Sequence, residues 1–376
     1  MTKRENLIKA LRCEMPEWVP ICGHVDNYNQ PARDGMDPEL NKALGTVNWG
    51  DEGTVLFSRY LDLDIMDWYG GAPVRTIRHN VTVEWKREGA DTTTVWHTPR
   101  GDLRDVIRQC RDDGTSYRLE HLLNGPQDLP AFASIFEDET FEVAPDRVER
   151  LARRKALIGD DGIIALPVFS TPLGMLIRAY AGVATTAYLT VDAPDALRDL
   201  FAVMEDNYTR FLRLAVQYDG DVIITVDDTS TTTISPAMFE TYCMGYTDRI
   251  ADLAHSAGKL YLHHSCGLIR DLLGLYRQTK MDGIHGFTIP PIGNVSVREG
   301  RRRVGPNISL FAGLMQIAGS MDDWPAVQAS VREMFAGASP GNGLVLGLFG
   351  EPTKNMAETK RLLDECRQYQ RCPYSL

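Results

Sequence analysis

Long apolar runs are missing from this 376-residue sequence. No uninterrupted apolar stretch approaches the ~20 residues that a helix needs to cross a bilayer. The first residues, Met1 to Asn6, are largely polar and charged and lack the apolar centre of a secretory signal peptide. These two absences predict a cytoplasmic protein that does not insert into a membrane.

Cysteine and positive charge are also scarce. The seven cysteines are scattered from Cys13 to Cys372, and an odd, dispersed set does not form a disulfide framework, which fits a reducing compartment. Lysine and arginine number 40 against 51 acidic residues, so the formal net charge is −11. An acidic chain without a dense basic cluster repels phosphate backbones and anionic lipids, which disfavours nucleic-acid and membrane-surface binding.

Three sequence motifs of common enzyme classes are absent as well. No GxGxxG follows an expected strand, and there is no phosphate-binding GxxxxGK[ST] and no GxSxG. The glycines of the first two motifs let the backbone approach phosphate groups, and the third holds a nucleophilic serine on a tight turn. Nucleotide-binding and serine-hydrolase functions therefore have little support.

What the sequence does contain, beyond about Phe141, is a regular alternation of short apolar runs and amphipathic stretches. Strands are expected at residues 162–169, 221–226, 259–263, 283–287, 308–312 and 344–348, with helices between and after them. Strands that alternate with helices predict a parallel sheet. With residues 18–24 as an opening strand, the pattern favours a TIM (β/α)8 barrel of the α/β class over an open doubly wound sheet.

Two features precede this alternation. Thr2 and Glu5 have the spacing of a capping box, which predicts an N-terminal helix before the first strand. From Val81 to Thr98 the apolar residues recur every second position on both sides of a turn that contains glycine, which predicts a β-hairpin. We therefore expect a single barrel domain over residues 1–376, with an N-terminal extension and a hairpin insertion at about 81–98.

The run from Lys259 to Gly267 ends in His264-Ser265-Cys266. Side chains alternate faces along a strand, so His264 and Cys266 point one way, and His263 and Ser265 point the other. An imidazole beside a thiolate at the mouth of a barrel forms half of a zinc site. The competing interpretation is that Cys266 is a small buried apolar residue and His264 a hydrogen-bonded core residue.

Polar residues follow the other expected strands too. In a barrel, residues just after the strands line the mouth. Asp227 and Asp228 are candidates for a catalytic or metal-binding carboxylate pair, although either could instead cap the helix that begins at Ser235-Pro236. Further candidates for substrate contact at the mouth are His24, Phe169, Thr229 and Glu351.

Residues from about Gly162 to Cys366 resemble the uroporphyrinogen decarboxylase superfamily. The resemblance is carried by Phe169-Ser170-Thr171-Pro172, Asp227-Asp228, Ile234-Ser235-Pro236-x-x-Phe239, His255-x-x-Gly258, His264-Ser265-Cys266-Gly267 and residues 308–313, and by the earlier Leu56-Phe57-Ser58. The superfamily implies a TIM barrel with one of two chemistries. One branch decarboxylates a tetrapyrrole without a metal. The other comprises zinc methyltransferases that exchange methyl groups between corrinoid proteins and thiols or other acceptors.

The decarboxylase branch does not match at its functional positions. That branch carries an arginine pair after the first strand, an aspartate after Phe-Ser, a tyrosine in the helix after the Pro motif, and a histidine near the last strand. In this chain residues 19–24 lack the arginine pair, Arg59 follows Phe57-Ser58, Arg178 stands near the tyrosine position, and no histidine follows His285. We therefore expect uroporphyrinogen not to be the substrate, and Arg178 to contact a different one.

The methyltransferase branch matches better. It implies a His-x-Cys ligand pair, which His264 and Cys266 supply, and a third ligand cysteine near the last strand. Residues 345–350 contain no cysteine, so Asp227, Asp228 or Glu351 is the expected replacement, and Cys366 lies too far along the last helix.

The resemblance thus implies a zinc-dependent methyltransferase that moves a methyl group between a small methylated substrate or acceptor and a corrinoid protein, for instance as a component of an O-demethylase. It also implies a homodimer. A decarboxylase-like enzyme with an altered site and a non-catalytic ligand-binding barrel remain the alternatives.

Overall fold

A computed structural model describes residues 1–23, 42, 52–68, 70–110, 115–314, 321–348 and 355–374. The chain forms two compact units. The first comprises residues 1–73, 145–168 and 216–376, and the second comprises residues 74–144 and 169–215. Whether the two unfold together, as the expected single domain would, stays a prediction.

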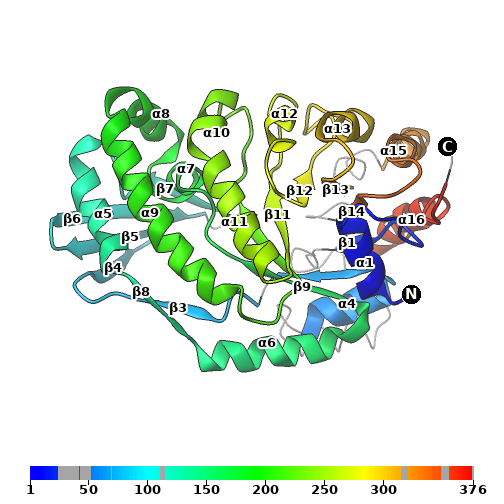
Figure 1. Cartoon of the computed structure of the whole chain (residues 1–376), viewed down its shortest axis with the longest axis horizontal. Helices are drawn as coiled ribbons and strands as arrows, with labels where there is room; N and C mark the ends of the chain where they lie inside the picture. The colour runs from blue at the N-terminus through cyan, green and yellow to red at the C-terminus, as the bar shows by residue number, and fades with distance from the viewer. Residues whose placement is uncertain are drawn as a thin grey trace. The chain divides into compact units, whose positions relative to one another are not determined.

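The first unit is built on one sheet of eight parallel strands (Figure 1). They are β1 (Ile21–Gly23), β2 (Ile65–Asp67), β9 (Gly162–Pro167), β10 (Val222–Val226), β11 (Leu260–His264), β12 (Gly283–Phe287), β13 (Ser309–Gly313) and β14 (Leu344–Leu348). Each strand pairs with the next along the chain, β14 pairs with β1, and a parallel bridge between Cys22 and Asp64 joins β1 to the start of β2. The sheet closes on itself, which confirms the predicted TIM barrel.

The strands β1 and β9 to β14 lie on the segments that the sequence predicts. Their continuous apolar runs are typical of parallel strands that are covered on both sides. Strand β2 (three residues) lies outside the predicted segments, because Asp62, Asp64 and Asp67 interrupt the apolar residues around it.

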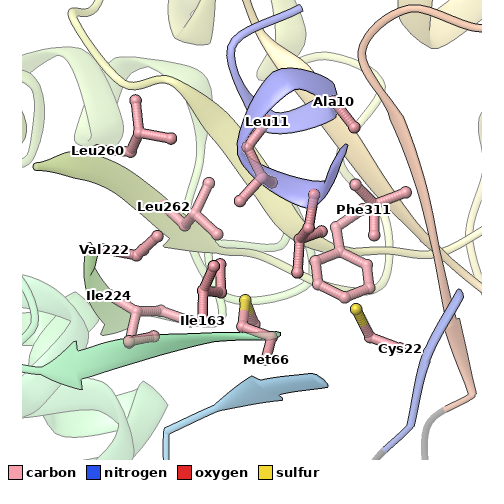
Figure 2. Packing of buried hydrophobic residues seen from close by; sticks show 13 residues of the cluster. Ala10, Leu11, Cys22, Met66, Ile163, Val222, Ile224, Leu260, Leu262 and Phe311 are labelled. Atoms are coloured by element: carbon pink, nitrogen blue, oxygen red, sulfur yellow. The ribbon is translucent and has the colours of Figure 1, made fainter. Parts of the chain in front are cut away.

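The interior of the barrel is filled by alternate side chains of the strands. Val222 and Ile224 of β10 and Leu260 and Leu262 of β11 belong to one buried apolar cluster, together with Phe311 of β13 (Figure 2). The side chains between them on each strand point to the outside of the barrel. This alternation determines which residues at the strand ends face the mouth.

Helix α1 (Lys3–Leu11) closes the barrel at the N-terminal ends of the strands. The predicted capping box at Thr2 and Glu5 is present. The apolar face of α1 places Leu7, Ala10 and Leu11 in the same cluster as the strand residues, and Figure 2 shows Leu11 pointing at the layer that contains Leu262. A closed floor leaves the C-terminal mouth as the end where a ligand has access.

The remaining helices of the first unit follow the order of the strands. They are α4 (Thr54–Tyr60), α6 (Pro145–Ile158), η3 (Gly159–Asp161), α10 (Pro236–Tyr242), α11 (Met244–Ser256), α12 (Leu273–Tyr276), α13 (Val297–Val304), α15 (Trp324–Gly337) and α16 (Met356–Arg367). Ser235 caps α10 through its side chain, so neither Asp227 nor Asp228 has that role. Of the helices described, none is both long and apolar enough to cross a membrane.

The second unit holds a four-stranded antiparallel sheet in the order β4-β5-β6-β7. Its strands are β4 (Thr82–Glu88), β5 (Asp91–Thr98), β6 (Gly101–Gln109) and β7 (Ser116–Glu120), and a separate pair joins β3 (Val74–Ile77) to β8 (Thr140–Val143). The hairpin expected at residues 81–98 is the β4–β5 pair, which turns at Gly89. The helical elements are η2 (Pro126–Asp128), α5 (Leu129–Asp138), α7 (Pro172–Met175), η4 (Leu176–Tyr180), α8 (Gly182–Asp192) and α9 (Pro194–Ala215).

Candidate metal centre

Strand β11 carries the two central residues of the site. Leu262 faces the barrel interior, so His264, two positions further along, faces the same way at the mouth. Cys266 follows just beyond the strand end, and both side chains are partly exposed, with 17% of the His264 side chain accessible. The expectation that these two residues share a face is met.

The loop after β10 brings an aspartate to this pair. The backbone N–H groups of Asp227 and Asp228 both approach the carbonyl oxygen of His264, at 3.3 and 3.2 Å, so the loop turns toward the end of β11. Asp228 has a φ of 50°, in the left-handed region that few residues other than glycine adopt. Strained backbone of this kind clusters at functional sites, and in this chain it accompanies a carboxylate that faces the mouth.

The three side chains converge on one point. The Oδ1 atom of Asp228 lies 3.0 Å from Nε2 of His264 and 3.4 Å from Sγ of Cys266. One donor atom from each residue lies within 4.8 Å of the other two, a spacing at which a single ion could contact all three. Among the described residues this is the one group of three or more histidine, cysteine and acidic side chains with that geometry.

The electrostatics of the group favour a cation. Burial, and then the negative charge of Asp228 and its hydrogen bond with the thiol, raise the pKa of Cys266 to about 12. The buried thiol therefore keeps its proton at neutral pH. A divalent cation between the thiol and the carboxylate would reverse this effect, because the thiolate is the metal-binding form.

Two side chains that the sequence did not single out complete the mouth around His264. His285 lies on β12, where it is the register partner of His264, and the two Nδ1 atoms are 2.7 Å apart. Trp68 directly follows β2, and its ring packs against His285 with a centroid distance of 4.9 Å. His285 lies inside β12 and not after its end, and Trp68 follows a strand that the sequence does not predict. A search limited to the ends of the predicted strands therefore misses both residues.

Trp68 is held by a buried ion pair behind it. Asp67, the last residue of β2, pairs with Arg154 of α6, with Nε of the arginine 2.6 Å from Oδ2, and both side chains are at most 3% exposed. A buried charge pair of this kind is costly to break. It fixes the end of β2 and therefore the position from which Trp68 reaches the mouth.

On the opposite face of β11, His263 and Ser265 belong to a fully buried polar network. The His263 Nε2 atom lies 2.9 Å from the Thr229 hydroxyl, which is also 3.0 Å from the Ser265 hydroxyl and 2.6 Å from that of Tyr276. The Nδ1 atom of His263 is 3.4 Å from a carboxylate oxygen of Asp227. Desolvation lowers the pKa of His263, so the ring stays neutral. Thr229 and Asp227 thus anchor the loop on both sides of Asp228.

Four other candidate residues belong to the second unit or lie outside the described residues. Phe169 belongs to the second unit, where its ring stacks on Tyr208 of α9 at 4.4 Å. Arg178 is an exposed residue of η4 in the same unit. His24 and Glu351 lie outside the described residues. The structure thus brings together Asp228, His264 and Cys266 from the set that the sequence proposed.

Known proteins resemble this chain in sequence family and in fold. The model of the uroporphyrinogen decarboxylase (URO-D) family matches residues 169–368. No curated protein sequence matches the chain. A solved methyltransferase from Methanosarcina mazei superposes with a TM-score of 0.61 at 15% identity, over 98% of this chain and 99% of that one. The D-psicose 3-epimerase of Clostridium cellulolyticum H10 gives a TM-score of only 0.29 at 12% identity, over 60% and 85%, which supports no argument.

The likeness to the methyltransferase establishes the barrel architecture and, at this identity, nothing finer. The family match is stronger evidence, because it spans more than half of the chain, from the end of β9 to the last helix. It includes the Asp227-Asp228 loop, the His264-x-Cys266 pair and His285. The chain is a member of the uroporphyrinogen decarboxylase (URO-D) family.

Proposed function

We propose that this protein is a zinc-dependent methyltransferase, which moves a methyl group between a small methylated substrate or acceptor and a corrinoid protein. The observation that carries the proposal is the convergence of Asp228, His264 and Cys266 at the mouth of the barrel, with their donor atoms within 4.8 Å of one another. The resemblance to the methyltransferase branch of the family and the shared barrel architecture support it.

The residues present fit a zinc ion. Imidazole nitrogen, thiolate sulfur and carboxylate oxygen are the three ligand types that zinc accepts in proteins, and catalytic zinc sites combine three protein ligands with one open position. Asp228 would take the place of the cysteine that the methyltransferase branch implies near the last strand, since β14 contains none. The Asp228 side chain is 41% exposed, which leaves room for a further ligand from the mouth.

Zinc bound by these residues would supply Lewis acidity, which turns a coordinated thiol into a thiolate or makes an ether oxygen a better leaving group. The chain itself would hold and orient the reacting molecule. His264 stands at the end of a buried strand and Asp228 on an anchored loop, so both ligands are pre-positioned. Trp68 would form an apolar wall beside the reacting group.

Decarboxylation of uroporphyrinogen is disfavoured, because Arg59 is engaged in contacts within the protein and not offered to a substrate carboxylate. A tetrapyrrole with many carboxylates calls for bidentate arginine contacts. Arg59, the arginine that follows Phe57-Ser58, instead bonds Asp161 at 2.7 Å and the carbonyl oxygen of Leu157 at 2.9 Å. Conversion of uroporphyrinogen to coproporphyrinogen at an enzyme-like rate would contradict the proposed function.

The direct test uses free methylcobalamin as the methyl carrier in place of the corrinoid protein. Zinc-loaded protein is mixed with methylcobalamin and a panel of small thiols, and separately cob(I)alamin is mixed with small methyl ethers, while the absorbance of the corrinoid is followed. Protein-dependent demethylation or methylation, lost in the Cys266→Ala variant, supports the proposal. Corrinoid turnover that is equal in the parent and in Cys266→Ala would overturn it.

A further inference from the structure

His285 of β12 contacts the one ring nitrogen of His264 that faces away from the candidate metal centre. Nε2 of His264 points to Asp228, at 3.0 Å from Oδ1, while its Nδ1 lies 2.7 Å from Nδ1 of His285. The two histidines are register partners on adjacent strands, so the contact is built into the sheet.

The contact determines how protons must be arranged if His264 binds a metal. A neutral imidazole that offers Nε2 to a metal carries its proton on Nδ1. That N–H must then donate to Nδ1 of His285, which accepts only when the His285 proton is on Nε2. A metal-binding histidine is generally oriented by a hydrogen bond from its second nitrogen, and such partners affect metal affinity strongly.

His285 is held rigidly enough to orient its neighbour. The residue is 1% exposed, and its ring is enclosed by two aromatic rings, with centroid distances of 4.9 Å to Trp68 and 4.8 Å to Phe311. The Phe311 contact is edge-on, at 86°, as aromatic pairs prefer. Rotation of the His285 ring would require these neighbours to move.

The residue after His285 makes room for His264. Gly286 has a φ of 78° and lies at an irregularity in the pairing of β12 with β13. A Cβ atom at this position would come within 2.6 Å of Cε1 of the His264 ring. Strand β12 therefore provides both a hydrogen-bond acceptor for His264 and the space that its ring occupies.

We propose that His285 is a positioning residue, which accepts a hydrogen bond from Nδ1 of His264 and thereby holds Nε2 in line with Asp228 and Cys266. This inference rests on the proposed metal centre. In this role His285 acts through His264 rather than on the metal or the reacting molecule.

Two substitutions separate the hydrogen bond from the packing. His285→Asn keeps an acceptor oxygen near the position of Nδ1, although it loses part of the ring. His285→Phe keeps an aromatic ring between Trp68 and Phe311 but has no acceptor. Zinc affinity of each purified protein is measured by competition with a chromogenic chelator, and the visible spectrum of the cobalt(II) form reports the coordination geometry.

We expect His285→Phe to weaken zinc binding by about 10- to 100-fold and to change the cobalt(II) spectrum. His285→Asn should bind zinc more tightly than His285→Phe and keep a parent-like spectrum. A melting temperature for each zinc-free protein shows whether the fold is intact. The proposal is overturned if His285→Phe folds and binds zinc as tightly as the parent, or if both variants lose zinc equally.

The same experiment distinguishes failure of this inference from failure of the proposed function. Should the parent itself bind no zinc above the level of Cys266→Ala, there is no metal centre for His285 to support, and both proposals fall. Should the parent bind zinc, Cys266→Ala lose it and His285→Phe keep it, the metal centre stands and only the role of His285 is wrong.

Discussion

The two ends of the barrel are built in different ways from the same strands. At the floor, α1 inserts Leu7 and Leu11 among apolar strand residues, and nearly every side chain is buried. At the mouth, Asp228, His264 and Cys266 are polar and partly exposed, and Asp228 and Gly286 have left-handed backbone. Strand β11 joins the two, since it contributes Leu260 and Leu262 to the core and His264 to the site. Stability is thus concentrated at the floor, which allows the mouth to hold strained and polar groups.

This difference predicts that substitutions at the two ends change different quantities. Those at the mouth should alter metal binding with modest changes in stability. Those at the floor should alter stability and leave metal binding unchanged. Stability is best compared in zinc-free protein, because a bound metal stabilises the folded state by itself.

Among the variants that compare the two ends, Gly286→Ala is expected to change zinc affinity most. The new Cβ would displace the His264 ring, so zinc affinity should fall by at least about tenfold, the lower end of the losses seen when the support of a metal-binding histidine is disturbed. Gly258→Ala is the matched control at the floor end of β11. Gly258 also has a positive φ, of 72°, but a Cβ there meets no atom within 4 Å. Both variants place an alanine at positive φ, which costs about 1–2 kcal/mol. Equal zinc affinity in the two would contradict the contrast between the ends.

Leu11→Ala tests the floor. Leu11 is fully buried in the cluster that α1 completes, and removing a buried leucine side chain lowers the free energy of unfolding by about 2–5 kcal/mol. We expect that loss by urea denaturation, with zinc affinity at 25 °C equal to that of the parent. A loss of zinc as large as that of Gly286→Ala would show that the two ends are not independent.

Asp64→Asn tests the point where β1 meets the start of β2, through the pH dependence of the free energy of unfolding. Burial raises the pKa of the Asp64 carboxyl from 3.8 to about 6, although it accepts a hydrogen bond from the Ile21 N–H at 2.9 Å. The folded state therefore binds this proton more tightly than the unfolded state. The resulting stabilisation is fully present below pH 3.8 and is lost as the pH rises through 6, by at most about 3 kcal/mol.

Asparagine cannot lose such a proton, so the variant should lack this part of the pH dependence. The free energy of unfolding of the parent minus that of Asp64→Asn should fall between pH 4.5 and 7.5, measured on zinc-free protein. A difference that is independent of pH in this range would show that the carboxyl titrates normally.

The barrel could be predicted from the sequence because its buried parallel strands are continuous apolar runs, each followed by a helix. The pairing of Asp228 with His264 and Cys266 could be anticipated in part, since adjacent parallel strands end at the same edge. Which of Asp227 and Asp228 faces the mouth could not, because it depends on the left-handed backbone of Asp228 and on the backbone hydrogen bonds of both residues to the His264 carbonyl oxygen.

The contact of His285 with His264 could not be predicted from the sequence, for a different reason. His285 lies inside β12, and its contact with His264 depends on the register between two strands that are 21 residues apart at these positions. Strand register is determined by packing across the whole sheet, which no local pattern reports. Trp68 follows β2, whose apolar residues are interrupted by aspartates, so the sequence does not reveal the strand end from which Trp68 reaches the mouth.

The measurement that tests the central claim most directly is the zinc content of the parent, Cys266→Ala and His263→Ala. We predict one zinc ion per chain in the parent and loss of most of it in Cys266→Ala, whose zinc-free stability should stay within about 1 kcal/mol of the parent.

His263→Ala is the control from the opposite face of β11, where Ser265 and Tyr276 still hold Thr229. It should keep its zinc and lose about 1–3 kcal/mol, because buried partners are left without a hydrogen bond. If Cys266→Ala keeps its zinc and loses only stability, the cysteine is structural, the metal centre is wrong, and a ligand-binding barrel becomes the better account.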